Sequence, residues 1–294
     1  MRNYCTLSDS NYLKFGKALF KSLCDTSSEN FVLYYLCLDD SSYEELMDYD
    51  IRLIPIKVNE VLSEYPNLQT YKDNSPYNYF CWSLASSFSR YLLEKKNLES
   101  IFYIDSDIFF YNDPKLIFEE IGDRSVGIIR HRHNTSISVD GEFNVGVVYF
   151  KNDSSGLGCL QWWNDAIILG TNPEMSTCGD QKYLEGFIPR FGDDVCVIDE
   201  TIAHGAPWNF RLYVYDHYDI DGSVVWGDKK QPLVFNHFSR VSYNEETGEI
   251  IPTNGNYADH TLNFQVFTIP VVRNFYIEYA KILKEIIDET TKAG

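Results

Sequence analysis

The segment Tyr103-Ile-Asp-Ser-Asp-Ile-Phe-Phe-Tyr-Asn-Asp-Pro114 (YIDSDIFFYNDP) decides the fold class of this chain. Two carboxylates, Asp105 and Asp107, interrupt an apolar run at 100–110 that otherwise predicts one fully buried strand. A buried charge without a partner is very unfavourable, so we expect both carboxylates to lie at the end of the strand and to be compensated there. In an extended chain residues i and i+2 point to the same face, which predicts that Asp105 and Asp107 converge on one ligand while Ser106 points away.

The chain before this segment alternates short apolar runs with stretches of helical periodicity. The expected elements are a strand at 4–7, a helix at 11–23, a strand at 31–38, a helix at 43–49, a strand at 51–56 and a helix at 82–94, whereas residues 57–80 show no clear periodicity. Alternation with continuous apolar strands is typical of a parallel sheet covered on both faces. The ligand crevice of such a sheet lies at the carboxyl ends of its strands.

The second half of the chain continues the α/β pattern with shorter elements. We expect a helix at 115–120, strands at 126–129 and 143–150, a helix at 159–169, a short helix from 179, and strands at 195–198, 224–226 and 233–235. Residues 241–268 are polar and turn-rich, and 270–290 form an amphipathic helix whose apolar face we expect to pack on the core. The pattern predicts one continuous domain, 1–240, with a C-terminal extension, 241–294, that ends in this helix.

The charge balance restricts the partners of the protein. Its 294 residues include 43 acidic and 25 basic side chains, a formal net charge of -18, which disfavours nucleic acid and anionic lipid as partners. The simplest way for such a protein to hold a phosphate compound is through a bound divalent cation. Seven cysteines without a C-x-x-C pair, and the lack of a signal peptide or transmembrane segment, predict a cytoplasmic protein. Nothing in the sequence indicates an oligomeric state.

The paired aspartates predict a metal site. Two convergent carboxylates suit a hard cation such as Mn²⁺ or Mg²⁺, whose coordination in nucleotide sites is completed by water and substrate phosphates. A D-x-D sequence occurs by accident in many acidic chains, but this one ends a buried strand in mid-sheet and precedes a turn. In the structural alternative, both aspartates cap the adjoining turn or pair with a nearby arginine.

Several segments, in the same order, resemble motifs of the nucleotide-diphospho-sugar transferases with the GT-A fold, in particular glycosyltransferase family 8, the glycogenin and galactosyltransferase-like group, and its bacterial relatives. They are Tyr4-Cys-Thr-Leu-Ser-Asp9, the helix that carries Arg90, the D-x-D strand, Phe143-Asn-Val-Gly-Val-Val-Tyr-Phe150, Gly179-Asp-Gln181 and Phe235-Asn-His-Phe-Ser239. The resemblance spans roughly residues 4–240 and implies a Rossmann-like, mixed, mostly parallel sheet flanked by helices. Residues 1–112 would bind the nucleotide sugar, and 113–240 would form the acceptor side.

The resemblance also implies roles for individual residues, in three groups. The metal ligands would be Asp105, Asp107 and His237. Contacts to the donor would come from Thr6, Leu7, Arg90, Asp105, Ser106 and Asp107. The catalytic residues at the transferred sugar or the acceptor would be Asn144, Asp180 and Gln181.

Each of these residues taken singly also has an ordinary structural explanation. His237 is equally a satisfied histidine in a strand, and Arg90 a solvated arginine on a helix. Asn144 beside Gly146 is equally a bulge residue, and Asp180 a helix N-cap.

The implied function is that of a metal-dependent hexosyltransferase. It would move a sugar from a nucleotide-diphospho-sugar, most commonly a UDP-sugar in the resembled family, to a glycan or another hydroxyl acceptor, with retention of anomeric configuration. Whether the transfer uses a protein nucleophile or a front-face route is left open.

Two other functions compete with this one. The first is a phosphohydrolase of the haloacid dehalogenase type, with a D-x-D nucleophile and a later acidic pair at Asp193 and Asp194. Against it, about a hundred residues precede the D-x-D, which in that fold belongs to the first strand. The second is a non-catalytic carbohydrate-binding protein, favoured by 22 Tyr and 5 Trp, although most of these aromatics fall in expected core elements.

Overall fold

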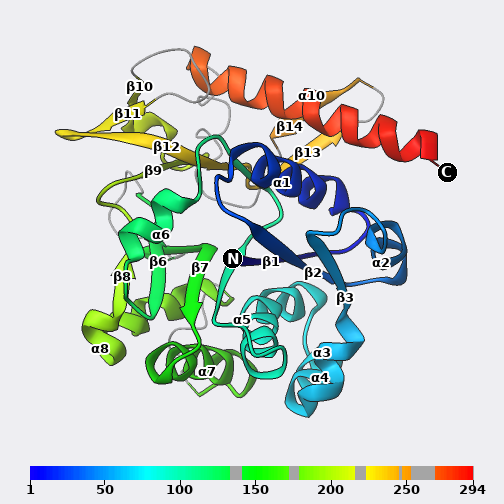
Figure 1. The fold of residues 1–294 in the computed structure, drawn as a ribbon, viewed down its shortest axis with the longest axis vertical. Coiled ribbons are helices and arrows are strands. Elements are labelled where there is room, and N and C mark those ends of the chain that lie inside the picture. Colours follow the sequence, from blue (N-terminus) through cyan, green and yellow to red (C-terminus); the bar gives the residue numbers. More distant parts are fainter. Residues whose placement is uncertain (133–140, 172–178, 216–222, 245–246, 253–268, 294) are drawn as a thin grey trace.

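The computed structural model describes residues 1–132, 141–171, 179–215, 223–244, 247–252 and 269–293 (Figure 1). Its larger sheet consists, from edge to edge, of β3 (Leu53–Lys57), β2 (Phe31–Cys37), β1 (Arg2–Ser8), β4 (Ser100–Ile104), β7 (Phe143–Lys151), β6 (Val126–Arg130) and β8 (Val195–Val197). Neighbouring strands are parallel except at β7, which is antiparallel to both β4 and β6. The mixed, mostly parallel sheet predicted from the sequence is confirmed.

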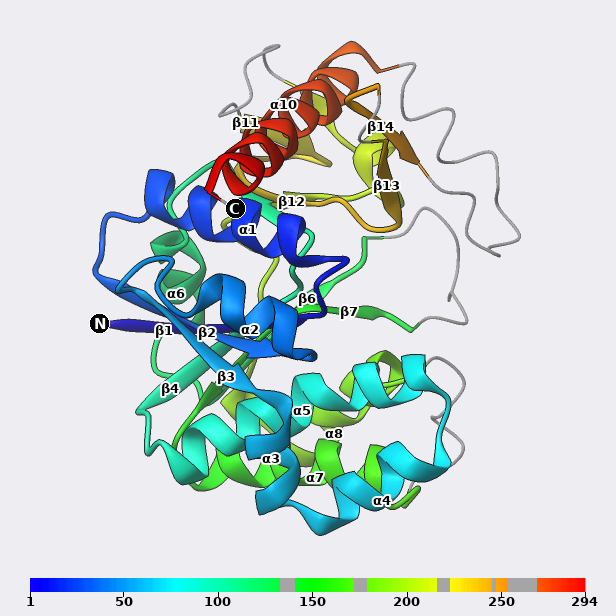
Figure 2. The ribbon, with the colours of Figure 1, turned by 90° about the vertical axis from the view of Figure 1, so that its right-hand side faces the viewer.

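Helices cover both faces of this sheet (Figures 1 and 2). One face is covered by α1 (Leu13–Thr26), α2 (Asp40–Leu46) and α6 (Lys115–Ile121). The other is covered by α3 (Val58–Glu64), α4 (Pro66–Asn74), α5 (Tyr77–Lys95), α7 (Ser154–Ile168) and α8 (Phe187–Phe191). In β1, Tyr4 packs in the first of these cores and Cys5 in the second. Because both faces are buried, the strands read as continuous apolar runs.

A smaller sheet lies beside the larger one (Figure 1). Its strands are β10 (Val214–Tyr215), β11 (Ser223–Trp226), β12 (Lys229–His237) and β5 (Ile108–Phe110), with β9 (Ala203–Gly205) paired to β12. The 3₁₀ helix η4 (Phe210–Leu212) packs in this half, whereas η2 (Gln181–Gly186) and η3 (Gly192–Asp194) pack with α8 on the side of the larger sheet.

The prediction of one strand at 100–110 was wrong, because the chain changes sheets within it. The N–H of Ile108 donates to the carbonyl of Asp105 (3.2 Å), which closes a turn between β4 and β5. β4 ends in the larger sheet, whereas β5 pairs with β12 in the smaller one. The D-x-D therefore lies in the connection between the two sheets.

The segment 57–80 is helical, which its sequence did not predict. α3, α4 and the first turn of α5 occupy most of it. α4 buries only Leu68, so it shows no apolar face, and its start is marked mainly by Pro66 in the first turn.

The C-terminal part packs against the N-terminal part. β13 (Val241–Asn244) and β14 (Glu249–Pro252) form a hairpin, and α10 (Pro270–Ala293) lies along α1 (Figure 2). Tyr279 of α10 stacks on Phe238 with a centroid distance of 4.0 Å, in a core shared with Phe15 of α1. The predicted packing of this amphipathic helix is confirmed, while the domain boundary at residue 240 stays a prediction. None of the described helices has the length and apolarity needed to cross a membrane.

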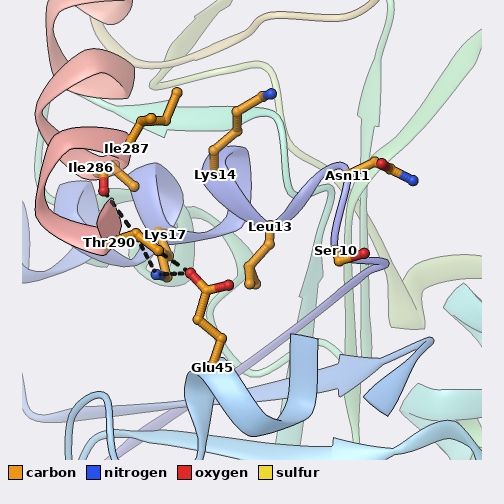
Figure 3. Close-up of a pocket in the computed structure, with 9 residues that line it drawn as sticks. All are labelled: Ser10, Asn11, Leu13, Lys14, Lys17, Glu45, Ile286, Ile287 and Thr290. Atoms are coloured by element: carbon orange, nitrogen blue, oxygen red, sulfur yellow. Dashed lines mark hydrogen bonds and ion pairs between the residues drawn. The ribbon is translucent and has the colours of Figure 1, made fainter. Parts of the chain in front are cut away.

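A cavity of about 330 Å³ lies where α1, α2 and α10 meet (Figure 3). Lys17 is 4 % exposed and forms an ion pair with Glu45 of α2, and its Nζ also donates to Oγ1 of Thr290 (3.1 Å). One buried ammonium group therefore ties three helices together.

Candidate active site

Asp105, Asp107 and His237 form a cluster at the carboxyl end of β4. Nε2 of His237 lies 3.0 Å from Oδ1 of Asp107 and 3.6 Å from Oδ2 of Asp105. Pairing of β5 with β12 brings these residues together, because His237 is opposite Ile108 in the register. The N–H of Phe238 also donates to the carbonyl of Asp107 (2.9 Å). In the part of the chain that the structure describes, this is the one group of three or more side chains able to hold a metal ion.

The two carboxylates converge for a different reason from the one predicted. Asp105, Ser106 and Asp107 belong to the turn between β4 and β5 rather than to one face of an extended strand. The turn places both carboxylates beside His237. Ser106, which separates the two aspartates in the sequence, is half-buried. Among the described residues neither aspartate pairs with an arginine, so the arginine-pairing alternative is not observed there.

The hydrogen bonds of Asn144 orient His237. Oδ1 of Asn144 accepts from the N–H of Gly146 (2.9 Å) and Nδ2 donates to Oε1 of Gln181 (3.0 Å), which fixes the amide orientation. Nδ1 of His237 lies 3.3 Å from the same Oδ1, so Nδ1 carries the proton of this hydrogen bond. Nε2 consequently faces the two carboxylates, and it is the nitrogen that a cation held by them would contact, as in metal-bound histidines.

The electrostatics of the cluster favour a bound cation. Burial raises the pKa of Asp105, opposed by His237 and reinforced by Asp107, and the hydroxyl of Tyr103 donates to its Oδ1 (2.7 Å). His237 is buried as well, but the two carboxylates raise its pKa overall. Two carboxylates and one imidazole, with Nε2 directed at the carboxylates, form a donor set that fits Mn²⁺ or Mg²⁺.

A bulge in β7 carries Asn144 and Gly146. The register between β6 and β7 shifts after Ile128, and the carbonyl of Gly146 accepts from the N–H of Asp105 (2.8 Å). A Cβ on Gly146 would lie 2.5 Å from Oδ1 of Asn144 and 2.7 Å from Nδ1 of His237, so only glycine fits. Asn144 therefore lies at a bulge, as one of its two explanations predicted, and it also contacts His237 of the cluster.

Asp180 and Gln181 lie on the other side of Asn144. Oε1 of Gln181 accepts from Asn144 and from the N–H of Val145 (3.2 Å). Asp180 is 4 % exposed; burial, together with the charge of Asp105, raises its pKa well above the ordinary range. It occupies the N-cap position of η2 without a side-chain capping bond, and the backbone N–H groups of Asp180 and Gln181 partly offset the rise in its pKa.

The other residues predicted to contact the donor are Thr6, Leu7 and Arg90. Thr6 and Leu7 lie near the carboxyl end of β1; Oγ1 of Thr6 is buried without a hydrogen-bond partner among the described residues, and Leu7 is half-buried. Arg90 is not brought to the cluster: its Nε donates to Glu94 (2.8 Å), and its guanidinium lies over the ring of Tyr65. Its contact with a donor stays a prediction.

Three residues around the cluster were not predicted from the sequence. Nε2 of His131 lies 3.2 Å from Nδ2 of Asn144, and Trp208 packs edge-on against both His131 and His237. Tyr103 is the third. His131 follows the strand predicted at 126–129, and a histidine near the end of a strand could have been considered a site residue. Trp208 lies in a segment without periodicity, so its sequence offered no such indication.

Solved structures share this fold. Mouse xyloside xylosyltransferase 1 superposes with a TM-score of 0.55 at 11% identity, covering 81% of this chain and 97% of that one. The galactosyltransferase LgtC, solved with donor and acceptor sugar analogues, superposes with a TM-score of 0.51 at 16% identity, covering 95% of each chain. The GT-A fold expected from the D-x-D and its companion motifs is confirmed.

Sequence comparison places the chain among bacterial relatives. No family model matches it. YfnF of Bacillus subtilis (strain 168) is 31% identical over 263 residues, which cover 82% of this chain and 83% of YfnF. YfnD of the same organism is 31% identical over 221 residues, which cover 72% of this chain and 69% of YfnD. The chain therefore belongs to the same protein family as YfnF and YfnD, and it has the GT-A fold of glycosyltransferases.

Proposed function

We propose that this protein is a metal-dependent glycosyltransferase, which transfers a hexose from a nucleotide-diphospho-sugar to a hydroxyl of a glycan or another acceptor. The observation that carries the proposal is the cluster of Asp105, Asp107 and His237 at the crevice edge of a GT-A sheet. Hydrogen bonds connect this cluster through Asn144 to Gln181, next to the buried Asp180.

In this proposal the cluster holds the cation on which the donor diphosphate binds. The two carboxylates and Nε2 of His237 supply three ligands, which leaves coordination positions for phosphate oxygens and water. A cation held there would neutralise the negative charge that develops on the leaving diphosphate. Tyr103 and Asn144 fix the orientation of Asp105 and His237 through their hydrogen bonds.

The donor extends from the cluster in two directions. We place the nucleoside, taken to be uridine, along Thr6 and Leu7 at the end of β1, and the diphosphate beside Ser106. The transferred sugar lies toward Asn144, Asp180 and Gln181, where a buried carboxylate and two amides surround its ring. Transfer proceeds with retention. A contact between Arg90 and the donor requires that Arg90 leave Glu94.

The phosphohydrolase alternative receives less support from the geometry. It needs a second acidic pair beside the D-x-D, but the group of candidate ligands among the described residues contains neither Asp193 nor Asp194. The carbohydrate-binding alternative does not require an Asp-Asp-His cluster with an oriented imidazole. The large aromatic side chains are mostly buried in the cores, as packing predicts.

The test is turnover of a panel of nucleotide sugars with Mn²⁺, read as release of nucleoside diphosphate, for the wild type and Asp107→Asn. We expect metal-dependent release that the variant abolishes. Release of phosphate from simple monoesters without nucleotide-sugar turnover would support the phosphohydrolase instead. Sugar binding without any turnover would support the carbohydrate-binding protein.

A further inference from the structure

A small aromatic pocket opens between α4, α5 and α7. It has a volume of about 130 Å³, and its walls are chiefly Tyr71, Tyr79, Trp82 and Tyr183, with Gly170 and Gly179 at one side. Trp82 and Tyr79 are each 41% exposed although their rings pack together at a centroid distance of 4.9 Å. Large aromatic side chains at such exposure form a ready contact surface for a ligand.

The aromatic pocket adjoins the segment that leads into the candidate active site. A Cβ on Gly179 would lie only 2.4 Å from the ring of Trp82, so the backbone at Gly179 rests on that ring. The next two residues along the chain are Asp180 and Gln181, and Gln181 bonds to Asn144. Asp180 is not itself in the wall of the aromatic pocket, but burial and the nearby charge of Asp180 raise the pKa of Tyr71, which is part of that wall. A ligand on Trp82 is therefore near Asp180.

The chemistry of the walls indicates the class of ligand. Among the described residues that line the aromatic pocket none is charged, which favours a neutral ligand. Flat aromatic faces suit the C–H faces of a sugar ring, and the tyrosine hydroxyls suit its hydroxyl groups. The volume is below the roughly 300–1,000 Å³ typical of drug-sized ligands, which suits one ring rather than an oligosaccharide.

We propose that the aromatic pocket is the acceptor subsite and binds one neutral hexopyranose ring against Trp82, with a hydroxyl of that ring directed toward Asp180. This inference rests on the proposed function. The nucleoside of the donor is the other flat ring that an aromatic wall attracts. We place it at the end of β1 rather than here, because Gly179 and Asp180 lie on the side of the transferred sugar.

The test compares Trp82→Phe, which keeps an aromatic face, with Trp82→Leu, which keeps only apolar bulk. The probes are methyl β-D-glucopyranoside and methyl β-D-galactopyranoside, titrated by saturation-transfer NMR and used as acceptors in transfer assays. For the probe that the wild type binds, we expect Trp82→Leu to raise Kd and acceptor KM roughly three- to tenfold, the range of an aromatic contact, and Trp82→Phe to change them less than about twofold. Tyr49→Leu, an exposed tyrosine that packs on Phe20 of α1, is the matched control.

The outcomes separate the subsite from the proposed function. Donor hydrolysis by the wild type with Mn²⁺ tests the proposed function alone, and its absence overturns both proposals. If the wild type hydrolyses a donor but binds neither glycoside, or binds one that Trp82→Leu and Trp82→Phe bind equally well, the subsite is overturned and the proposed function stands. A loss of UDP affinity in Trp82→Leu with unchanged glycoside binding would assign the pocket to the nucleoside and overturn the inference. Thermal melting of each variant verifies that the protein still folds when Trp82, which is half-exposed, is replaced.

Discussion

Nε2 of His237 lies 3.0 Å from Oδ1 of Asp107, although His237 ends β12 and Asp107 belongs to the turn after β4. The pairing of β12 with β5 holds the two side chains together, and the bond from the N–H of Phe238 to the carbonyl of Asp107 fixes the connection. A metal site made in this way depends on the contact between the two sheets.

Loss of one carboxylate should weaken metal binding. We expect Asp107→Asn to lower the affinity for Mn²⁺ by about 100-fold or more, because it removes the charge of a ligand, and changes to residues that only orient a ligand already cost about 10–100-fold. Electron paramagnetic resonance of free Mn²⁺ measures this directly. Asp193→Asn, which removes an exposed carboxylate outside the cluster, serves as the control. Equal affinities in the two variants would remove Asp107 from the site.

The amide of Asn144 should matter for metal binding although it is not a ligand. Asn144→Leu removes the acceptor for Nδ1 of His237, and we expect an affinity for Mn²⁺ that is about 10–100-fold lower. Asn144→Asp keeps an acceptor and should retain more of the affinity. Asn74→Leu, on the exposed surface of α4, is the control. An Asn144→Leu variant with wild-type affinity would contradict the orienting role.

Gly146 should not tolerate a side chain. A methyl group there collides with Asn144 and His237, so we expect Gly146→Ala to weaken Mn²⁺ binding and to lower the free energy of unfolding by about 1–3 kcal/mol. Gly158→Ala is the matched control, because its Cβ meets only Phe191, at 3.5 Å, inside α7. Urea denaturation and Mn²⁺ titration of both variants check this, and equal behaviour of the two would show that the close approach at Gly146 is not required.

Replacing Glu45 should lower the free energy of unfolding more than replacing Lys17, because the ammonium group of Lys17 is buried. Glu45→Ala leaves that charge buried among α1, α2 and α10 with Thr290 as its remaining hydrogen-bond partner. We expect a loss of about 2 kcal/mol of unfolding free energy, below the cost for a fully buried pair because Glu45 is partly exposed. Lys17→Met replaces the charge with an apolar chain and should cost less than about 1 kcal/mol. Urea denaturation would contradict this if Lys17→Met were the more damaging change.

Asp39 should contribute stability that depends on pH. Burial alone would raise its pKa, but bonds from the N–H groups of Ser10 (2.9 Å) and Ser42 (2.8 Å) lower it below the ordinary value of 3.8. The folded state therefore binds this proton less readily than the unfolded state, so the stabilisation is complete above pH ~4 and is lost as the pH falls through the lowered pKa.

The variant Asp39→Asn isolates this effect, because it keeps an acceptor but removes the titrating charge. We expect the wild type to be the more stable protein at pH 6 and the difference to shrink as the pH is lowered to about 3, measured by urea denaturation. Asp48→Asn, at an exposed carboxylate after α2, should show no such convergence. A difference between wild type and Asp39→Asn that is constant with pH would refute the assignment.

The sequence predicted the layered fold but not the point at which the chain passes from the larger sheet to the smaller one. β1 and β2 bury both faces, so their apolar runs predicted interior strands correctly. The break between β4 and β5 escaped prediction, because it is set by pairing with β12, far along the chain. α4 escaped because it buries only Leu68 and so lacks an apolar face.

The candidate site was likewise predicted only in part. The D-x-D and His237 were predicted together only through the resemblance of several motifs, and the structure brings His237 within hydrogen-bonding distance of Asp107 and next to Asp105. Trp208 and Tyr103 were missed, because tertiary contacts rather than local pattern bring them to the cluster. Arg90 pairs with Glu94 four residues along the same helix, a local pair that helical spacing favours, and its predicted contact with the donor stays a prediction.

The central claim is that Asp105, Asp107 and His237 bind the donor diphosphate through a cation. Calorimetric titration of UDP into the protein with Mn²⁺ and with EDTA, for the wild type, Asp107→Asn and Asp193→Asn, tests it most directly. We predict saturable UDP binding with Mn²⁺ that EDTA and Asp107→Asn both abolish and that Asp193→Asn retains. Binding of UDP with equal affinity in EDTA, or in Asp107→Asn, would contradict the claim.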